Sequence, residues 1–469
     1  MPSFLRFPAL LLALAPLALQ SAPAQAEGLR FGFAKRTITP TLGERPVFMA
    51  GFDHDRRATG VHDDLWARAV AVSDGEHRVV VVAVDLIGVF HADVEKARAR
   101  LRERVGDVAL VVSSTHNHEG PDTMGLWGRG RFTSGVDPEY LDRVRRTIVD
   151  AAADALSRLE PARLVLAKTR TPGLIVDGRL PQVIDDELVV LQAIGVEGRT
   201  LGTVVNWGSH PEALGGENTL LTADFPHFLN QRLEEELGGT AVFLVGSIGG
   251  LMTPLGLELR DEEGGAIPPD SFALARAVGE RVAAAATLAL RTSGHDSESS
   301  VVEYRSASVD VPLENRLFRL AAFLGVVDRP VFSAGAPATT VFGDDIRTEV
   351  GLLRIGDASA LCVPGEIYPE LVVGGIQDPQ DKGADIPGAP REPPLKDLLR
   401  SEHRLVIGLA NDEIGYIIPR SQWDARAPFA YGRDESQYGE VNSVGPGVAS
   451  RLAEALARIS RQAFCCDAR

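Results

Sequence analysis

Short apolar runs alternate with longer stretches of helical periodicity along most of the chain. The apolar runs are rich in β-branched residues and are bounded by Gly, Asp or Pro, which predicts buried strands. These runs lie at 77–86, 108–113, 188–192, 202–206, 240–245 and 349–355. Between them, apolar positions recur with helical spacing at 92–105, 138–159, 225–237, 271–290 and 448–462. This mixture predicts an α/β fold in which helices flank mixed β-sheets, rather than an all-β barrel.

The first 26 residues have the pattern of a secretory signal peptide. Arg6 precedes an apolar run at residues 8–19, and Ala24-Gln25-Ala26 has the form of a cleavage site. A membrane anchor would need roughly 20 apolar residues in a row, and this shorter run is interrupted by Pro16. We therefore expect cleavage before Glu27, export to the periplasm or the medium, and no integral membrane segment afterwards.

Residues 27–469 are expected to form one domain, because they contain no low-complexity linker, fixed-period repeat or sharp change in composition. Two Gly/Pro/Asp-rich stretches, 378–394 and 428–447, are predicted loops. The formal net charge is −16, which argues against nucleic acid or an anionic membrane surface as an electrostatic partner. Three cysteines give no disulfide framework.

Two of the predicted strands end in histidine beside a chain-breaking residue. The first runs into His116 and His118 ahead of a Gly-Pro pair, and the second ends at His210-Pro211. In an extended chain, residues i and i+2 share a face, so His116 and His118 can point into one pocket. A single His-x-His is also typical of a polar strand exit. Because α/β folds place ligands at strand ends and imidazole suits zinc, the two strand ends together predict a Zn²⁺ site.

Two further polar residues follow apolar runs nearer the C-terminus. Glu366 comes after a Pro-Gly turn, and Tyr416 lies in an apolar run after an Asn-Asp turn. From pattern alone, a solvated turn glutamate and a core tyrosine with its hydroxyl satisfied are the more common interpretations. Asp224 has the same ambiguity: it can support a ligating histidine or cap the helix that follows it.

The order of these segments resembles that of the neutral, non-lysosomal ceramidase family from near the mature N-terminus to about residue 450. The motifs that carry the resemblance are Met49-Ala-Gly-Phe52 with Ala58-Thr-Gly-Val-His62, Leu65-Trp-Ala-Arg-Ala69, Ser114-Thr-His-Asn-His-Glu-Gly-Pro-Asp122, Asn206-Trp-Gly-Ser-His-Pro211, Val363-Pro-Gly-Glu366 and Asn411-Asp-Glu-Ile-Gly-Tyr-Ile417. Each motif is short, but their common order is specific. The resemblance implies a ceramidase catalytic-domain-like fold and a zinc hydrolase.

By that resemblance, the zinc ligands are His116, His210, Glu366 and Tyr416. The implied catalytic residues are His118 as a substrate-side hydrogen-bonding group, Arg179 as the active-site arginine, Tyr431 as a second active-site tyrosine, and Thr253. The implied reaction is cleavage of an N-acyl amide, from a small-molecule or lipid-like acyl substrate, by a metal-activated water.

The chain departs from the family pattern at three points. The family's serine after an Asn-x-Gly-Asp turn is missing, so Thr253, or alternatively Ser247, is expected to supply the hydroxyl. Glu119 stands where the family usually has a small hydroxyl residue, and is expected to change the polarity that the pocket accepts. No sequence for a C-terminal β-sandwich domain follows residue 462.

Two other functions remain open from the sequence. The lost serine favours a zinc esterase or lactonase on the same scaffold, since an ester leaving group depends less on an acid catalyst. A noncatalytic exported binding protein that has kept the pocket is the alternative from another class. A serine hydrolase is excluded by the absence of a Gly-x-Ser-x-Gly nucleophile elbow.

Overall fold

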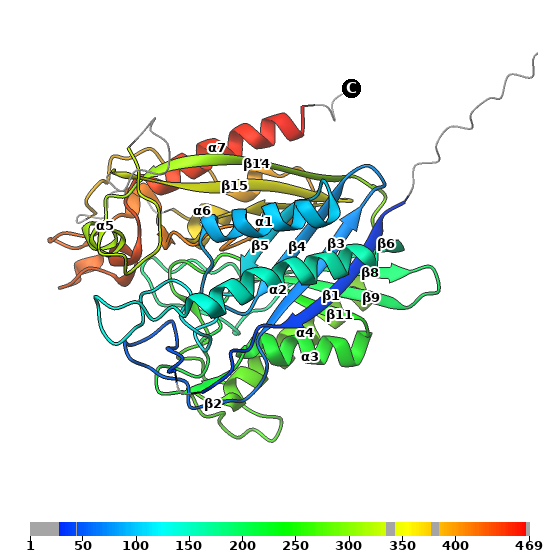
Figure 1. Cartoon of the computed structure of the whole chain (residues 1–469), viewed down its shortest axis with the longest axis horizontal. Coiled ribbons are helices and arrows are strands. Elements are labelled where there is room, and N and C mark those ends of the chain that lie inside the picture. The colour runs from blue at the N-terminus through cyan, green and yellow to red at the C-terminus, as the bar shows by residue number, and fades with distance from the viewer. Residues whose placement is uncertain (1–27, 44, 334–342, 377–383, 466–469) are drawn as a thin grey trace, which may run out of the picture.

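The computed structural model describes residues 28–43, 45–333, 343–376 and 384–465, in which two β-sheets are enclosed by helices (Figure 1). The signal peptide predicted at residues 1–26 lies outside the described residues. Among the described residues, no helix has both the length and the apolar character needed to cross a membrane. The α/β class predicted from the sequence is confirmed.

The larger sheet is mixed. Its strand order is β11 (Thr240–Val245), β9 (Thr200–Trp207), β8 (Glu187–Gly195), β6 (Glu160–Arg170), β1 (Arg30–Thr37), β3 (Trp66–Ser73), β4 (Arg78–Val84) and β5 (Ala109–Ser114), with β13 (His295–Asp296) paired to β6. The pairs at the two edges, β11–β9 and β4–β5, are parallel, and the pairs between them are antiparallel.

The smaller sheet packs face to face on the larger one. Its strands follow the order β14 (Val302–Pro312), β15 (Asp345–Ile355), β16 (Ala358–Cys362) and β18 (His403–Ile407). Phe33, Val81 and Val204 of the larger sheet belong to one buried cluster with Leu353 and Leu405 of the smaller sheet. Strands buried on both faces explain why the sequence shows near-continuous apolar runs here.

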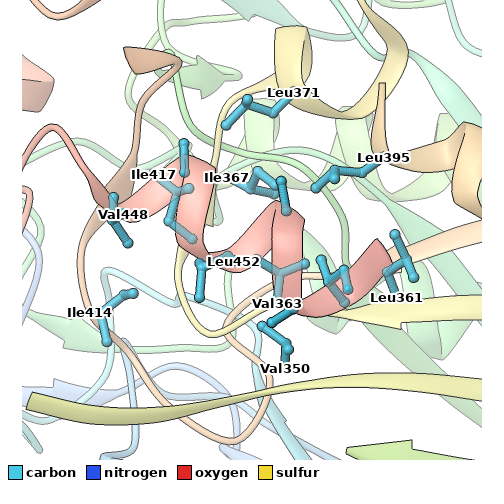
Figure 2. Packing of buried hydrophobic residues seen from close by; sticks show 14 of the residues in the cluster. Val350, Leu361, Val363, Ile367, Leu371, Leu395, Ile414, Ile417, Val448 and Leu452 are labelled. Carbon is cyan, nitrogen blue, oxygen red and sulfur yellow. The ribbon is translucent and has the colours of Figure 1, made fainter. Parts of the chain in front are cut away.

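Helices cover the two outer faces. α1 (His91–Val105) and α2 (Pro138–Ser157) pack on β3 to β5, whereas α3 (Phe225–Leu237) and α4 (Phe272–Ser293) pack on β8, β9 and β11. α7 (Val448–Ala463) covers the smaller sheet, where Leu452 lies among Val350, Leu361 and Val363 (Figure 2). The side chains of β15 and β16 alternate between α7 and the other sheet, as strand geometry requires. The layers therefore run helix, sheet, sheet, helix.

Short elements build the end of the molecule that carries the candidate site. They are the strand pairs β2 (Gly60–Val61) with β10 (Leu220–Leu221), β7 (Val176–Asp177) with β12 (Met252–Thr253), and β17 (Glu366–Ile367) with β19 (Tyr416–Ile417), the helices α5 (Arg316–Phe323) and α6 (Pro369–Val373), and the 3-10 turns η1 (Leu395–Leu398), η2 (Arg420–Gln422), η3 (Ala430–Gly432) and η4 (Tyr438–Asn442). The segment predicted as a loop at 428–447 thus contains η3 and η4.

Residues 408–410 tie the ends of several strands together. The Gly408 N–H donates to Val245 O at the end of β11 (2.9 Å), and Leu409 O accepts from Ser114 N at the end of β5 (3.3 Å). Ala410 N donates to Val363 O beyond β16 (2.9 Å). This bridging segment joins the ends of the two edge strands of the larger sheet, β11 and β5, close to His116 and His118, which follow β5.

Asp224 begins helix α3. Its side chain accepts from Phe225 N, and it is fully buried. Burial raises the pKa of Asp224 from 3.8 to about 7, helped by the charges of Glu212 and Asp63 and opposed by the hydrogen bond from Phe225. The helix-cap interpretation of Asp224 is therefore confirmed, and the cap is made by a carboxyl group whose pKa burial raises into the neutral range.

We expect Asp224→Asn to change how stability depends on pH. A folded-state pKa above the unfolded value stabilises the wild type at low pH, and this stabilisation is lost as pH rises from about 4 to about 7. At about 1.36 kcal/mol per pKa unit, the wild type should lose up to about 4 kcal/mol over this window relative to the variant. Urea unfolding at several pH values measures the gap.

Asp137→Asn is the matched control, since Asp137 caps α2 through Glu139 N and Tyr140 N but is exposed. This variant removes a capping carboxylate that is exposed rather than buried. A stability gap between Asp224→Asn and the wild type that stayed constant from pH 4 to pH 8 would contradict the assignment.

Candidate metal centre

Three buried imidazoles converge beyond the ends of β5 and β9. The ring centroids of His116, His118 and His210 lie 5.0, 5.0 and 5.6 Å apart. Each ring offers a nitrogen, and these three nitrogens all lie within 4.8 Å of one another. A buried group of this kind can hold a metal ion. The convergence predicted for these histidines is confirmed.

Backbone carbonyls orient two of these rings. Nδ1 of His116 lies 2.8 Å from Ile87 O, and Nδ1 of His210 lies 2.9 Å from Met252 O. Because a carbonyl oxygen only accepts, Nδ1 carries the proton in both rings and Nε2 faces Glu366. Burial, opposed by the Glu366 charge, lowers the pKa of His116 to about 4. Burial would also lower the pKa of His210, but the hydrogen bond to Glu366 and the Glu212 charge raise it. Rings anchored through Nδ1 on a carbonyl, with Nε2 turned to the centre, are arranged as metal ligands usually are.

Glu366 joins the two Nε2 atoms. Its Oε2 lies 3.0 Å from Nε2 of His210 and 3.4 Å from Nε2 of His116. Burial alone would raise the pKa of Glu366, but the two histidines and a hydrogen bond from Tyr416 hold it below its usual value. Glu366 and Tyr416 are partners in the parallel β17–β19 pair. All four residues predicted as ligands are therefore brought together, and the solvated-glutamate interpretation of Glu366 is wrong, since the side chain is buried.

His116 and His118 do not lie in an extended strand, although the sequence pattern predicted one. β5 ends at Ser114, and His116 has a left-handed backbone with φ 64°. A non-glycine residue in this region is strained by about 1–3 kcal/mol and persists only where its surroundings hold it. Here the bond to Ile87 O and the bridging segment 408–410 hold it.

The three imidazoles line a cavity of about 530 Å³. Its polar lining comprises Asp53, His116, His118, His210, Glu212, Thr253, Arg329, Glu366, Glu413, Tyr416, Tyr438 and Asn442. Its apolar lining includes Phe52, Ile87, Phe90, Met124, Leu126, Trp127, Leu251, Leu255, Leu313, Phe318, Ala322, Val327, Ile346, Ile414 and Val444. A mostly apolar cavity with a few convergent polar groups is typical of a small-molecule site.

Comparison with known proteins finds a family match over part of the chain. Residues 30–175 match the sequence profile of the family described as neutral/alkaline non-lysosomal ceramidase, N-terminal. This part of the chain is similar to that family. The matched segment contains His116 and His118, whereas His210, Glu366 and Tyr416 lie beyond it, so only the geometry above bears on those three residues.

Solved structures show that the likeness of fold extends over nearly the whole chain. The crystal structure of neutral ceramidase from Pseudomonas aeruginosa superposes with a TM-score of 0.70 at 18% identity, over 93% of this chain and 74% of that one. A ceramidase structure complexed with C2 gives 0.69 at 18% identity, over 92% and 75%. The ceramidase-like catalytic fold expected from the sequence is confirmed.

Arg179 is not among the described residues that line the cavity. Its guanidinium makes two bonds of 2.8 Å to the Glu440 carboxylate, donates to Gln422 O (3.0 Å) and stacks over the Tyr368 ring. Both members of this ion pair are buried. The structure therefore does not bring Arg179 together with the histidines, and its contacts are those of a residue that holds the loops of η2 and η4.

The second active-site tyrosine is likewise placed differently from the expectation. Tyr431 is not among the described residues that line the cavity, whereas Tyr438 is, and its ring lies 5.9 Å from that of Tyr416. Of the two candidate hydroxyls, Thr253 lines the cavity and Ser247 bonds Asp185 instead. Two tyrosines seven residues apart in one loop cannot be distinguished by sequence pattern alone.

Glu119 does not shape the cavity, contrary to the expectation from the sequence. Its carboxylate is buried against Arg56 (3.3 Å) and Asn218 (2.7 Å), and it is not among the described lining residues. Gly51 (φ 96°) lies so close to the His118 ring that a Cβ there would be 2.4 Å from it. The Met-Ala-Gly-Phe motif of the family thus has a physical reason in this chain: only glycine leaves room for His118.

Glu212 is the site residue that sequence reasoning missed. It lines the cavity, and its Oε2 lies 3.2 Å from Nδ1 of His118. A carboxylate two residues after His210, in His-Pro-Glu, was the available signal.

Proposed function

We propose that this chain is a zinc-dependent amidohydrolase that cleaves an N-acyl compound with a water activated at the metal. The match of residues 30–175 to the ceramidase family supports a hydrolase of amide bonds. The observation that carries the proposal is the convergence of three buried imidazoles and Glu366 on the wall of a mostly apolar cavity. His116, His210, Glu366 and Tyr416 would hold the ion, whose bound state supplies a nucleophile at neutral pH and a Lewis acid for the carbonyl.

The other residues that line the cavity would have different roles in binding and catalysis. The apolar wall would bind the acyl chain, which excludes water from it. His118 would move a proton to the leaving nitrogen, since an amine does not depart as an anion. Tyr438 is the cavity hydroxyl available to donate to the developing oxyanion, taking the role that the sequence suggested for Tyr431.

Two measurements on the purified chain test this proposal. Metal analysis should find one zinc per chain, and dialysis against a chelator should abolish hydrolysis of N-acyl amines until zinc is restored. Matched amide and ester substrates with the same acyl group separate an amidohydrolase from an esterase or lactonase. A chain that holds no stoichiometric metal and cleaves neither bond would sink the proposal and favour the binding protein.

The apolar wall leads to a prediction about chain length. Ala322 lies in α5 and lines the cavity, so Ala322→Phe should fill the space for the distal part of an acyl chain. We expect kcat/KM for a dodecanoyl amide to fall by at least about 10-fold, while that for an acetyl amide stays within about 2-fold. Leu317→Phe is the matched control, because Leu317 is in the same helix but 68% exposed. Equal losses for both substrates would contradict the assignment of this wall.

A further inference from the structure

Glu212 is a carboxylate without a lysine or arginine partner. Only 6% of its surface is exposed, and it lines the cavity. Its partners among the described residues are the His118 ring and the Thr253 hydroxyl. Burying a carboxylate beside neutral groups is costly unless they donate hydrogen bonds to it. The position of Glu212 therefore needs an explanation in terms of those two donors.

The Thr253 hydroxyl supports the Glu212 carboxylate. Its Oγ1 accepts from Leu255 N (3.0 Å), and its proton is donated to the Glu212 carboxylate, which lowers the pKa of Glu212 against the effect of burial. Thr253 therefore contributes to holding Glu212 in place.

The His118 ring is held on several sides. Its backbone N–H donates to Pro211 O (3.0 Å), its carbonyl accepts from Arg56, and the Phe52 ring packs edge-on at 5.0 Å. Among the described residues, neither ring nitrogen has an aligned hydrogen bond. Nδ1 nevertheless lies 3.2 Å from Glu212 Oε2, and such bonds commonly tighten only when substrate is bound.

We propose that Glu212 is a positioning residue that holds His118 as the Nδ1–H tautomer, leaving Nε2 as the proton-transferring atom. A carboxylate only accepts, so Nδ1 must carry the proton that faces it. Nε2 can then take a proton from the attacking water and give it to the amide nitrogen. The new C–O bond forms, the C–N bond breaks with its electron pair on nitrogen, and the products are a carboxylic acid and an amine.

This inference rests on the proposed function for its catalytic step but not for the tautomer itself. The Asp-His pairs of serine proteases show how large the effect of a tautomer can be, since replacing the carboxylate with an amide there lowers kcat by about 10⁴-fold with the geometry intact. Gln at position 212 would keep the bond from Thr253 but could present N–H to Nδ1. His118 would then be driven to the other tautomer.

The experiment compares Glu212→Gln with the wild type on amides and on 4-nitrophenyl esters of the same acyl group. We expect kcat for the amide to fall about 10²–10⁴-fold with KM nearly unchanged, and kcat for the ester to fall much less, because 4-nitrophenolate leaves without a proton. Metal content should stay at the wild-type value. Glu212→Asp should restore part of the amide activity, and Glu217→Gln, at an exposed position nearby, should leave both activities unchanged.

Nitrogen NMR of histidine-labelled protein tests the tautomer without any activity. The His118 signal, identified from its loss in His118→Gln, should be that of Nδ1–H in the wild type and of Nε2–H in Glu212→Gln. Nε2–H in the wild type, equal losses of amide and ester activity, or loss of metal from Glu212→Gln would overturn the inference. A wild type that binds no metal and cleaves no amide would instead refute the proposed function.

Discussion

His116→Ala should abolish both metal binding and amide hydrolysis, and His210→Ala should do the same. Nε2 of each ring lies within 3.4 Å of Glu366 Oε2, and the Nδ1 of each is anchored on a backbone carbonyl. Alanine removes one ligand from a site that has few, and the loss of metal removes both the nucleophile and the Lewis acid. We expect kcat/KM to fall by at least about 10³-fold, which corresponds to about 4 kcal/mol of transition-state stabilisation.

Metal analysis of the purified variants and the rate of amide hydrolysis with added zinc check this result. His77→Ala is the control, since His77 is exposed and pairs only with Asp74 near the surface. It should keep the wild-type metal content and rate. A His116→Ala variant that retained stoichiometric metal and full activity would remove the proposed centre.

Arg179→Met should lower the free energy of unfolding by about 3–5 kcal/mol, because it leaves the buried Glu440 carboxylate without its partner. The ion pair is two-pronged, and Glu440 also accepts from Asp424 N (3.0 Å). The double variant Arg179→Met with Glu440→Leu should recover much of this loss, since two apolar side chains replace the pair and no charge is left buried.

Chemical unfolding of the single and double variants measures this coupling. The same variants decide between the two interpretations of Arg179. If it only holds η2 and η4, the folded double variant keeps its metal and most of its kcat. If Arg179 contacts substrate, as the family resemblance implies, the double variant folds well but loses activity.

Much of the architecture could be predicted because periodicity reports local structure. The helix at 225–237 and the strand at 240–245 match α3 and β11, since each has the apolar spacing of its type and a clear breaker beside it. α5 was not predicted. It spans only eight residues, which is too short for apolar spacing along the sequence to be recognised as a helix.

Only the part of the site that follows strand ends or matches family motifs could be predicted from the sequence. Histidines after β5 and β9 were recognisable, because strand termini favour ligands. The contacts of Arg179, Glu119 and Glu212 were not, since each depends on a partner from a distant segment. The separation between Arg179 and Glu440 is 261 residues, and no local pattern reports such a pairing.

The bridging segment 408–410 has a consequence for how the catalytic centre comes into being. The ends of β5 and β11 and the residue after β16 are hydrogen-bonded to this late segment. A nascent polypeptide that contains His116, His118 and His210 but not yet residues 408–410 lacks these bonds and also lacks Tyr416. Capture of the ion would then follow synthesis of this segment, and binding of the ion to the folded form alone would favour the completed domain over any partly assembled form.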